Sequence, residues 1–340
     1  MRIAKYPRGN CFLMKCNGKS SRHTQSRMES QQTPKPTVAV IGVGQVGGAV
    51  AYALILSSVA SEILLVDIKS DLRDAQVRDL SDVAYAGNSG TRVRAGTYHE
   101  ARECDIVVIT AGSKYSIGET SSQHMDRNIA IVRGVVNAMR PYRPDTILLV
   151  VANPVDLLTS LAHEISGLPA SQVLGSGTFL DSVRLRGLVS EAIGVSANSI
   201  DLYVLGVHGP SQVAAWSTAT VGGIPIGKAV LPVSFDRAKL ADECRHRSQR
   251  IVSAKGATPF GIGSIVTSIC SSIVCDKRNV RPISCYQPEY GCCFSLPVVL
   301  GRKGVIRRFA VPVSDEEKDA IKESAGALKE TLDKIHDSEK

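Results

Sequence analysis

Residues 38–47 read Val38-Ala39-Val40-Ile41-Gly42-Val43-Gly44-Gln45-Val46-Gly47, an apolar, β-branched run that leads into glycines spaced G-x-G-x-x-G. A stretch rich in alanine and leucine follows, so the pattern predicts a strand, a tight turn and a helix. The first glycine allows the turn, the second lets backbone approach a pyrophosphate, and the third lets the helix pack against the strand. The helix N-terminus then faces the phosphates. We therefore expect a dinucleotide site that contains Gly42, Gly44, Val46 and Gly47.

A second apolar run, residues 63–66, ends at Asp67, which lies 20 residues beyond Gly47. A carboxylate at this point accepts a hydrogen bond from a ribose 2′-hydroxyl and repels a 2′-phosphate, so NAD is favoured over NADP. Further strand-like runs at 106–110, 147–151 and 200–206 alternate with helical stretches. The sequence thus predicts an α/β fold with a Rossmann-type, doubly wound parallel sheet whose ligand crevice lies where the strands end.

Composition narrows the class of protein. The chain has 340 residues, 44% hydrophobic and 21% charged, and no apolar run approaches the ~20 residues of a membrane helix. We therefore expect no membrane as partner. Of the formal charge of +8, residues 1–37 carry +7, so the rest of the chain is nearly neutral and we expect no nucleic acid as partner. Nine cysteines without a C-x-x-C pair predict free thiols in a reducing compartment, the cytoplasm, and no metal site.

The basic N-terminal segment, residues 1–37, lacks sustained helical periodicity and ends in Thr33-Pro34-Lys35-Pro36. We expect a disordered tail. Its arginines and scarce acids are compatible with mitochondrial targeting, although its glycines and prolines would break the amphipathic helix of such a signal. Met28 as the true initiator is the alternative, in which residues 1–27 are absent from the native protein.

Three side chains downstream of the dinucleotide signature suit the reduction of a 2-oxo acid. Asp181 and Arg184 follow Gly175-Ser176-Gly177, and His208 lies between Val207 and Gly209. Arginine can hold a substrate carboxylate by two parallel hydrogen bonds. A histidine kept basic by an aspartate can carry the proton to and from the carbonyl oxygen.

From about residue 38 to residue 336 the chain resembles the L-lactate/malate dehydrogenase family. The matching motifs are Gly42 to Gly47, Asp67, Thr110-Ala111-Gly112, Gly118-Glu119-Thr120, Asn153-Pro154-Val155-Asp156, Gly175 to Arg184, His208-Gly209 and Lys255-Gly256-Ala257-Thr258. The resemblance implies an NAD-binding domain over 38–180, a mixed α/β substrate domain over 181–338, and a homodimer or homotetramer.

The resemblance also implies a role for each matched residue. His208 is expected to be the acid/base, Asp181 its partner and Arg184 the carboxylate clamp. Asn153 is expected to contact both substrate and nicotinamide, and Thr258 to line the substrate pocket. The remaining cofactor contacts are expected at Tyr98, Gly112, Ser113 and Ser176.

Two departures from the family pattern fall in the loop after the third strand-like run. The family places an arginine directly after Gly-Glu-Thr, where it polarises the substrate carbonyl, and this chain has Ser121. Loss of one such donor typically costs ~10²–10³ in kcat. Arg127 and Lys114 are possible substitutes. At the specificity position, where lactate enzymes have glutamine and malate enzymes arginine, stands Tyr115, which disfavours a second substrate carboxylate.

Three functions follow from these observations. The first is an NAD-dependent L-lactate dehydrogenase whose altered loop still works. The second is a dehydrogenase for another 2-oxo acid, with Tyr115 shaping the pocket. The third is an NAD-binding homologue with impaired catalysis.

Overall fold

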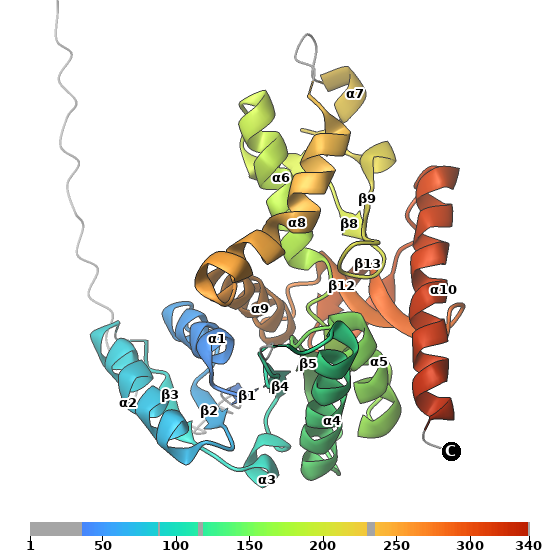
Figure 1. Ribbon diagram of the computed structural model, residues 1–340. Coiled ribbons are helices and arrows are strands. Elements are labelled where there is room, and N and C mark those ends of the chain that lie inside the picture. The colour runs from blue at the N-terminus through green and yellow to red at the C-terminus, as the bar shows by residue number, and fades with distance from the viewer. Residues whose placement is uncertain (1–35, 88, 115–117, 230–234, 339–340) are drawn as a thin grey trace, which may run out of the picture. The chain divides into compact units, whose positions relative to one another are not determined.

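The computed structural model describes residues 36–87, 89–114, 118–229 and 235–338 (Figure 1). Residues 1–35 of the predicted tail, and Tyr115 in the predicted substrate loop, lie outside the described residues. Across the described part, no helix has the length and apolar character needed to cross a membrane.

A nine-stranded sheet forms the centre of residues 36–338. Six of its strands are parallel and lie in the order β3 (Arg92–Ala95), β2 (Glu62–Val66), β1 (Thr37–Ile41), β4 (Ile106–Ile109), β5 (Ile147–Val150) and β6 (Val173–Gly175). This order, 3-2-1-4-5-6, is that of a dinucleotide-binding doubly wound sheet and confirms the predicted fold class. The sheet continues antiparallel through β12 (Asn279–Gln287), β13 (Cys292–Gly301) and β14 (Gly304–Arg308).

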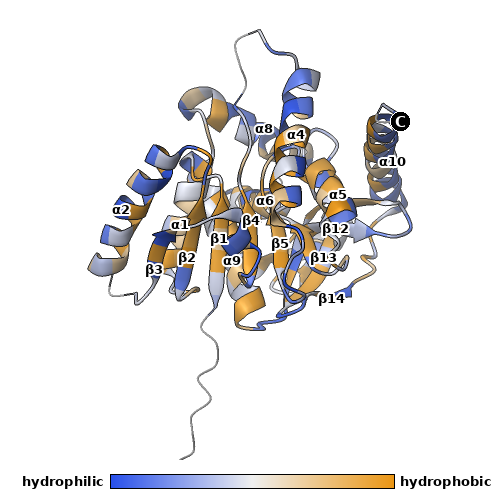
Figure 2. Cartoon of the chain, turned by 90° about the horizontal axis from the view of Figure 1, so that it is seen from below, coloured by the Kyte–Doolittle hydropathy of each residue, from blue (hydrophilic) through white to orange (hydrophobic). Residues whose placement is uncertain are grey.

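Helices cover both faces of this sheet, which explains the continuous apolar runs of its strands (Figure 2). Along β1, Val38 and Val40 face one core and Ala39 and Ile41 face the other. The first core is closed by α1 (Gln45–Leu56), α2 (Ser70–Ala86) and α9 (Pro259–Val274). The second is closed by α3 (Tyr98–Ala101), α4 (Ser121–Met139), α5 (Val155–Ser166) and α10 (Asp315–Asp337).

A third core lies between α6 (Phe179–Ile193), α8 (Arg237–Lys255) and short strands from the middle of the chain. The remaining elements of the described residues are η1 (Ala197–Ser199), β7 (Ile200–Asp201), β8 (Val204–Leu205), β9 (Val213–Ala214), η2 (Trp216–Thr218), β10 (Thr220–Val221), β11 (Ile224–Pro225) and α7 (Ile226–Ala229). Buried side chains of α6 and α8, such as Leu185 and Cys244, join this core. Helix α8 therefore packs directly on α6.

Helix α10 begins with a capping box. Ser314 Oγ accepts from the backbone N–H of Glu317, whose side chain returns to the backbone of Ser314. Ile321, Leu328 and Leu332 are buried along one side. This amphipathic helix packs against β13 and β9, and Ser324 Oγ of α10 accepts from the backbone N–H of Val207, the residue before His208.

Candidate active site

The glycine loop after β1 has the close packing that its sequence predicts. Gly42 has φ +86°, and a Cβ on it would lie 2.5 Å from the Cα of Ala111. A Cβ on Gly47 would lie 2.1 Å from the carbonyl oxygen of Gly42. A Cβ on Gly44 would meet nothing within 4 Å, so this N-cap of α1 opens to a ligand. Val46 packs against the first core. The loop therefore fits a pyrophosphate approached by backbone.

Asp67 lies beside this loop at the end of β2. One carboxylate oxygen accepts from the N–H of Val43 at 2.8 Å and the other from the N–H of Lys69 at 2.9 Å. A carboxylate oxygen can accept more than one hydrogen bond, so both oxygens keep capacity for a ribose hydroxyl. Tyr98 begins α3 nearby, and burial together with the charge of Asp67 raises the pKa of its phenol. These contacts fit the adenosine end of a dinucleotide.

The loops after β4 and β5 are joined by a buried amide that sequence reasoning missed. Asn128 of α4, 2% exposed, accepts from the N–H and hydroxyl of Ser113 at 2.7 and 3.0 Å. Its NH₂ group donates to the carbonyl oxygen of Asn153 at 3.0 Å. Gly112 and Ser113 are thereby fixed relative to Asn153. No short-range pattern in the sequence marks Asn128 as the link.

His208 and Asp181 are brought together from separate segments. His208 Nδ1 lies 2.7 Å from Asp181 Oδ2; the histidine side chain is 22% exposed and the aspartate 2%. Burial alone would lower the pKa of His208. The charge of Asp181, its hydrogen bond and the charge of Asp156 outweigh burial and raise this pKa to about 9. The imidazole is therefore a protonated, solvent-accessible acid at neutral pH.

Asp156 is a second carboxylate at this histidine. It is 2% exposed on α5, and its Oδ2 accepts from the backbone N–H of His208 at 2.6 Å. Burial raises its pKa to about 6, although the N–H and charge of His208 act in the opposite direction. The motif Asn153-Pro154-Val155-Asp156 contained this residue, but its spacing to His208 is created only by the fold.

Arg184 lies one turn along α6 from Asp181. Its side chain is 9% exposed, and its Nη1 lies 3.5 Å from Asp181 Oδ1. Burial would raise the pKa of Asp181, but the charge and hydrogen bond of His208 and the charge of Arg184 together lower it. Asp181 is thus an ionised bridge between the imidazole and the guanidinium. The three predicted chemical groups meet at one place.

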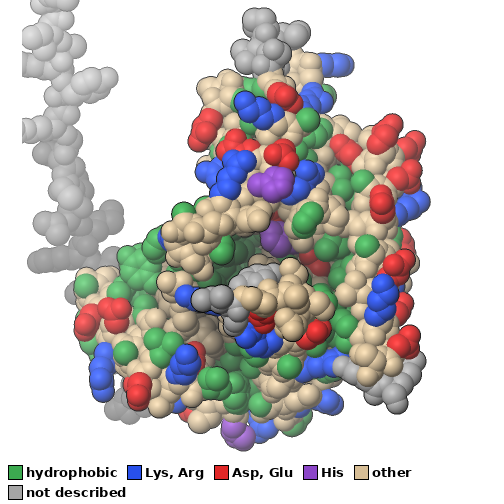
Figure 3. Space-filling model, viewed as in Figure 1, with side chains coloured by type: hydrophobic (Ala, Val, Ile, Leu, Met, Phe, Trp, Pro, Cys, Tyr) green, Lys and Arg blue, Asp and Glu red, His purple; other side chains and the backbone are tan. Residues whose placement is uncertain are grey.

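Two further predicted residues, Ser176 and Thr258, lie at the ends of secondary-structure elements. Ser176 follows β6, is 4% exposed, and donates its N–H to the carbonyl oxygen of Val150 at 2.9 Å. Thr258 is the half-buried residue before α9. Figure 3 shows the surface hollowed below α8, on the face viewed in Figure 1. The described residues thus place most of the predicted set where the strands β1, β4, β5 and β6 end.

Ser121 is exposed at the first position of α4, directly after the N-cap Thr120. Arg127, the suggested substitute cation, is engaged elsewhere. Its Nε donates to Ser113 Oγ at 2.9 Å, its Nη2 donates to the carbonyl oxygen of Lys114 at 3.1 Å, and it forms an ion pair with Glu119. Arg127 therefore ties the two ends of the loop to α4, which disfavours its role as the polarising cation.

The described cysteines are free thiols, and all except Cys275 are buried. Within the part of the chain that the structure describes, no group of three or more histidine, cysteine or acidic side chains could hold a metal ion. The described site contains the imidazole of His208, the carboxylates of Asp181 and Asp156, and the guanidinium of Arg184.

A Rossmann-type sheet beside a histidine paired with a buried aspartate and next to a buried arginine is typical of the class of nicotinamide-dependent oxidoreductases. The family model for the lactate/malate dehydrogenase NAD-binding domain matches residues 36–175, and that for the α/β C-terminal domain matches residues 178–339. The chain belongs to the lactate/malate dehydrogenase family.

Individual relatives agree with this assignment. The chain is 41% identical over 292 residues to L-lactate dehydrogenase A of Rhizopus oryzae, covering 86% of this chain and 91% of the relative. It is 36% identical to L-lactate dehydrogenase of Thermus aquaticus, covering 86% and 97%. The crystal structure of the minor L-lactate dehydrogenase from Enterococcus mundtii in the ligands-bound form superimposes with a TM-score of 0.84 at 34% identity, covering 88% and 98%.

Proposed function

We propose that this chain is an NAD-dependent L-lactate dehydrogenase, which interconverts pyruvate and NADH with L-lactate and NAD. The observation that carries the proposal is the contact of one buried carboxylate, Asp181, with both His208 and Arg184. This arrangement couples an acid to a carboxylate-binding group, as reduction of a 2-oxo acid requires. Relatives named L-lactate dehydrogenase support the same choice of reaction.

The residues around the glycine loop would hold the cofactor. Backbone of Gly42, Gly44, Val46 and Gly47 would face the pyrophosphate, and Asp67 the ribose. Around the rest of the cofactor we place Tyr98, Gly112, Ser113, Asn153 and Ser176. NADH, when bound, supplies the hydride.

The chain's own groups manage the proton and the substrate anion. Asp181 accepts from Nδ1–H of His208, which leaves Nε2–H to donate to the substrate carbonyl oxygen. Arg184 binds the substrate carboxylate, while Asn153 and Thr258 contact the remainder of the substrate. Tyr115, the other substrate residue that the sequence predicts, lies outside the described residues. In the reverse direction the neutral imidazole takes the hydroxyl proton.

A second candidate is a dehydrogenase for another 2-oxo acid, or a weakly active NAD-binding homologue. The observation that favours it is the exposed Ser121 at the start of α4, combined with the engagement of Arg127 by Glu119 and Ser113. A neutral hydroxyl cannot stabilise the charge that develops on the carbonyl oxygen as an arginine would.

We further propose a homodimer or homotetramer in the cytoplasm, with an NAD-binding domain over 38–180 and a substrate domain over 181–338. Exposed apolar side chains on the packed helices α1 and α9, namely Tyr52, Leu56 and Phe260, support association. The buried free thiols suit a reducing compartment. The matches of the two family models support the division of the chain.

A panel of 2-oxo acids tests the proposal directly. With NADH, purified protein should reduce pyruvate faster than oxaloacetate or bulkier 2-oxo acids. NADPH should bind far more weakly than NADH in a fluorescence titration, because Asp67 repels a 2′-phosphate. Preference for a bulkier acid would favour the second dehydrogenase. NADH binding without turnover of any 2-oxo acid would instead identify an impaired homologue.

Restoring the missing cation should accelerate the reaction. Ser121→Arg is expected to raise kcat for pyruvate roughly ten- to a thousand-fold, because charge on the carbonyl oxygen grows mainly in the transition state. KM should change less. Steady-state kinetics check the result, and Ser122→Arg, which adds the same charge one position further along α4, is the matched control.

Two further variants test whether Lys114 or Arg127 replaces the missing loop arginine. If Lys114 already polarises the carbonyl, Lys114→Ala should collapse kcat and Ser121→Arg should add little. Arg127→Ala should loosen the loop and raise KM, since its contacts join both loop ends to α4. A fast wild-type enzyme indifferent to all of these changes would contradict our account of the loop.

A further inference from the structure

One face of α8 contacts both residues that α6 contributes to the site. Cys244 Sγ donates to the backbone carbonyl oxygen of Asp181 at 3.2 Å. One turn later, Ser248 Oγ accepts from Arg184 Nη1 at 2.5 Å. Cys244 is 1% exposed, and positions i and i+4 of a helix lie on the same face. This face of α8 therefore contacts the guanidinium of Arg184 as well as the backbone of α6.

The contacts at Nη1 determine which edge of the guanidinium is left for substrate. Nη1 carries two N–H groups; it donates to Ser248 Oγ at 2.5 Å and lies 3.5 Å from Asp181 Oδ1. The Nε and Nη2 groups form the other edge of the planar fork, whose two parallel N–H groups match a carboxylate. Asp181 alone, at 3.5 Å and shared with His208, is a loose restraint.

The charged groups around Arg184 explain why a neutral partner such as Ser248 suits this guanidinium. Burial lowers the pKa of Arg184, the charge of Asp181 opposes that effect, and the nearby guanidinium of Arg247 acts in the same direction as burial. A neutral hydroxyl can hold Nη1 without withdrawing the positive charge that must attract a substrate carboxylate. A second carboxylate in place of Ser248 would neutralise it.

We propose that Ser248 is a positioning residue, whose hydroxyl holds Nη1 of Arg184 so that the Nε–Nη2 edge faces the carboxylate of the 2-oxo acid. The proposal rests on the proposed function of Arg184 as the carboxylate clamp. It also assigns α8 a direct part in substrate affinity, because any shift of this helix relative to α6 moves the clamp.

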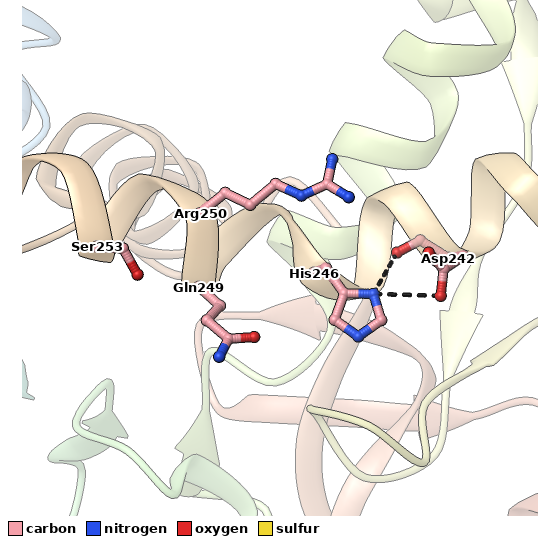
Figure 4. Close-up of a pocket in the computed structure, with 5 residues that line it drawn as sticks. All are labelled: Asp242, His246, Gln249, Arg250 and Ser253. Atoms are coloured by element: carbon pink, nitrogen blue, oxygen red, sulfur yellow. Dashed lines mark hydrogen bonds and ion pairs between the residues drawn. The ribbon is translucent and has the colours of Figure 1, made fainter.

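A surface hollow on α8 provides the control. Figure 4 shows its lining residues Asp242, His246, Gln249, Arg250 and Ser253, with His246 bonded to Asp242. At 100° per residue, Ser253 lies on the side of α8 opposite Cys244 and Ser248. Ser253→Ala therefore removes the same hydroxyl from the same helix without touching Arg184.

The experiment compares Ser248→Ala with wild type and with Ser253→Ala. Because an ordered side chain is released, KM for pyruvate should rise roughly two- to twelvefold, which corresponds to ~0.5–1.5 kcal/mol. Ki for oxamate, a carboxylate that is not reduced, should rise by the same factor. The Kd for NADH should stay unchanged, and kcat should change less than KM. Ser253→Ala should match wild type, and Ser248→Thr, which keeps the hydroxyl, should restore affinity.

Two further variants keep the test decisive. Ser248→Cys preserves volume but offers a weak acceptor, so it should raise Ki as alanine does even if alanine destabilises the fold. With Arg184→Lys already present, Ser248→Ala should add little, because the two changes act on one group. Unchanged KM and Ki in an active Ser248→Ala enzyme would overturn the role of Ser248 alone. A wild type that turns over no 2-oxo acid would instead overturn the proposed function.

Discussion

Replacing His208 with alanine should lower kcat for pyruvate reduction by roughly 10²–10⁴-fold, the usual contribution of a positioned acid or base. The Kd for NADH should remain unchanged, because the imidazole acts on the substrate carbonyl. Stopped-flow kinetics and fluorescence titration give the two quantities. His246→Ala is the matched control, since His246 is also bonded to an aspartate, Asp242 at 3.2 Å, but lies on the surface hollow of α8.

The rates of pyruvate reduction and lactate oxidation should depend on pH in opposite directions. The pKa of His208 is raised to about 9, so the imidazole is protonated below that pH, and pyruvate reduction should be sustained up to about pH 9 and fall above it. Lactate oxidation, which needs the neutral imidazole, should rise through the same range. Asp181→Asn removes the main cause of the raised pKa of His208. Burial should then lower this pKa, so the fall in the rate of pyruvate reduction should move to lower pH. An unchanged pH–rate profile in Asp181→Asn, or near-normal kcat in His208→Ala, would refute the assignment of His208 as the acid.

Replacing Arg184 with lysine should lower kcat/KM for pyruvate by roughly 10²–10³-fold, within the ~2–5 kcal/mol typical of a lost buried ion-pair contact. Lysine keeps the charge, but its ammonium cannot reproduce the planar fork and cannot reach Ser248 and a substrate carboxylate together. Most of the loss should appear in KM, with NADH binding unaffected.

The control for this change is Arg186→Lys, two residues further along α6, where Nε donates to the carbonyl oxygen of Ser182 at 3.2 Å. It makes the same substitution in the same helix on a different side. Wild-type kinetics are expected for Arg186→Lys. A small KM effect in Arg184→Lys would show that another group anchors the substrate carboxylate.

The sequence predicted the fold because the signals for it are local. Gly42 and Gly47 stand where a side chain would overlap backbone, so their spacing reveals the turn between β1 and α1. The apolar runs reveal strands buried on both faces, and Ser314 with Glu317 reveals the start of α10. Such features depend on neighbours within a few residues, which a pattern can record.

For the candidate site, the sequence predicted some residues and the structure revealed others. Sequence supplied His208, Asp181 and Arg184, because motif order and chemical type restrict them. It named Asp156 within a motif but did not reveal that this carboxylate accepts from the backbone N–H of His208, 52 residues away. It also did not reveal that Ser248 accepts from Arg184, 64 residues away. The sequence allows Arg127 as a polarising cation, but its contacts with Ser113, Lys114 and Glu119 fasten the loop instead.

By itself, the sequence determined the doubly wound sheet, the dinucleotide loop and the kinds of group available for acid/base chemistry. Only the tertiary structure decided which polar groups support them. Hydrogen bonds such as those from His208 to Asp156 and from Arg184 to Ser248 join segments that the chain brings together only when α5, α6 and α8 are packed. A serine or aspartate at such a position resembles any other in sequence, because its partner is set by three-dimensional packing and not by spacing along the chain.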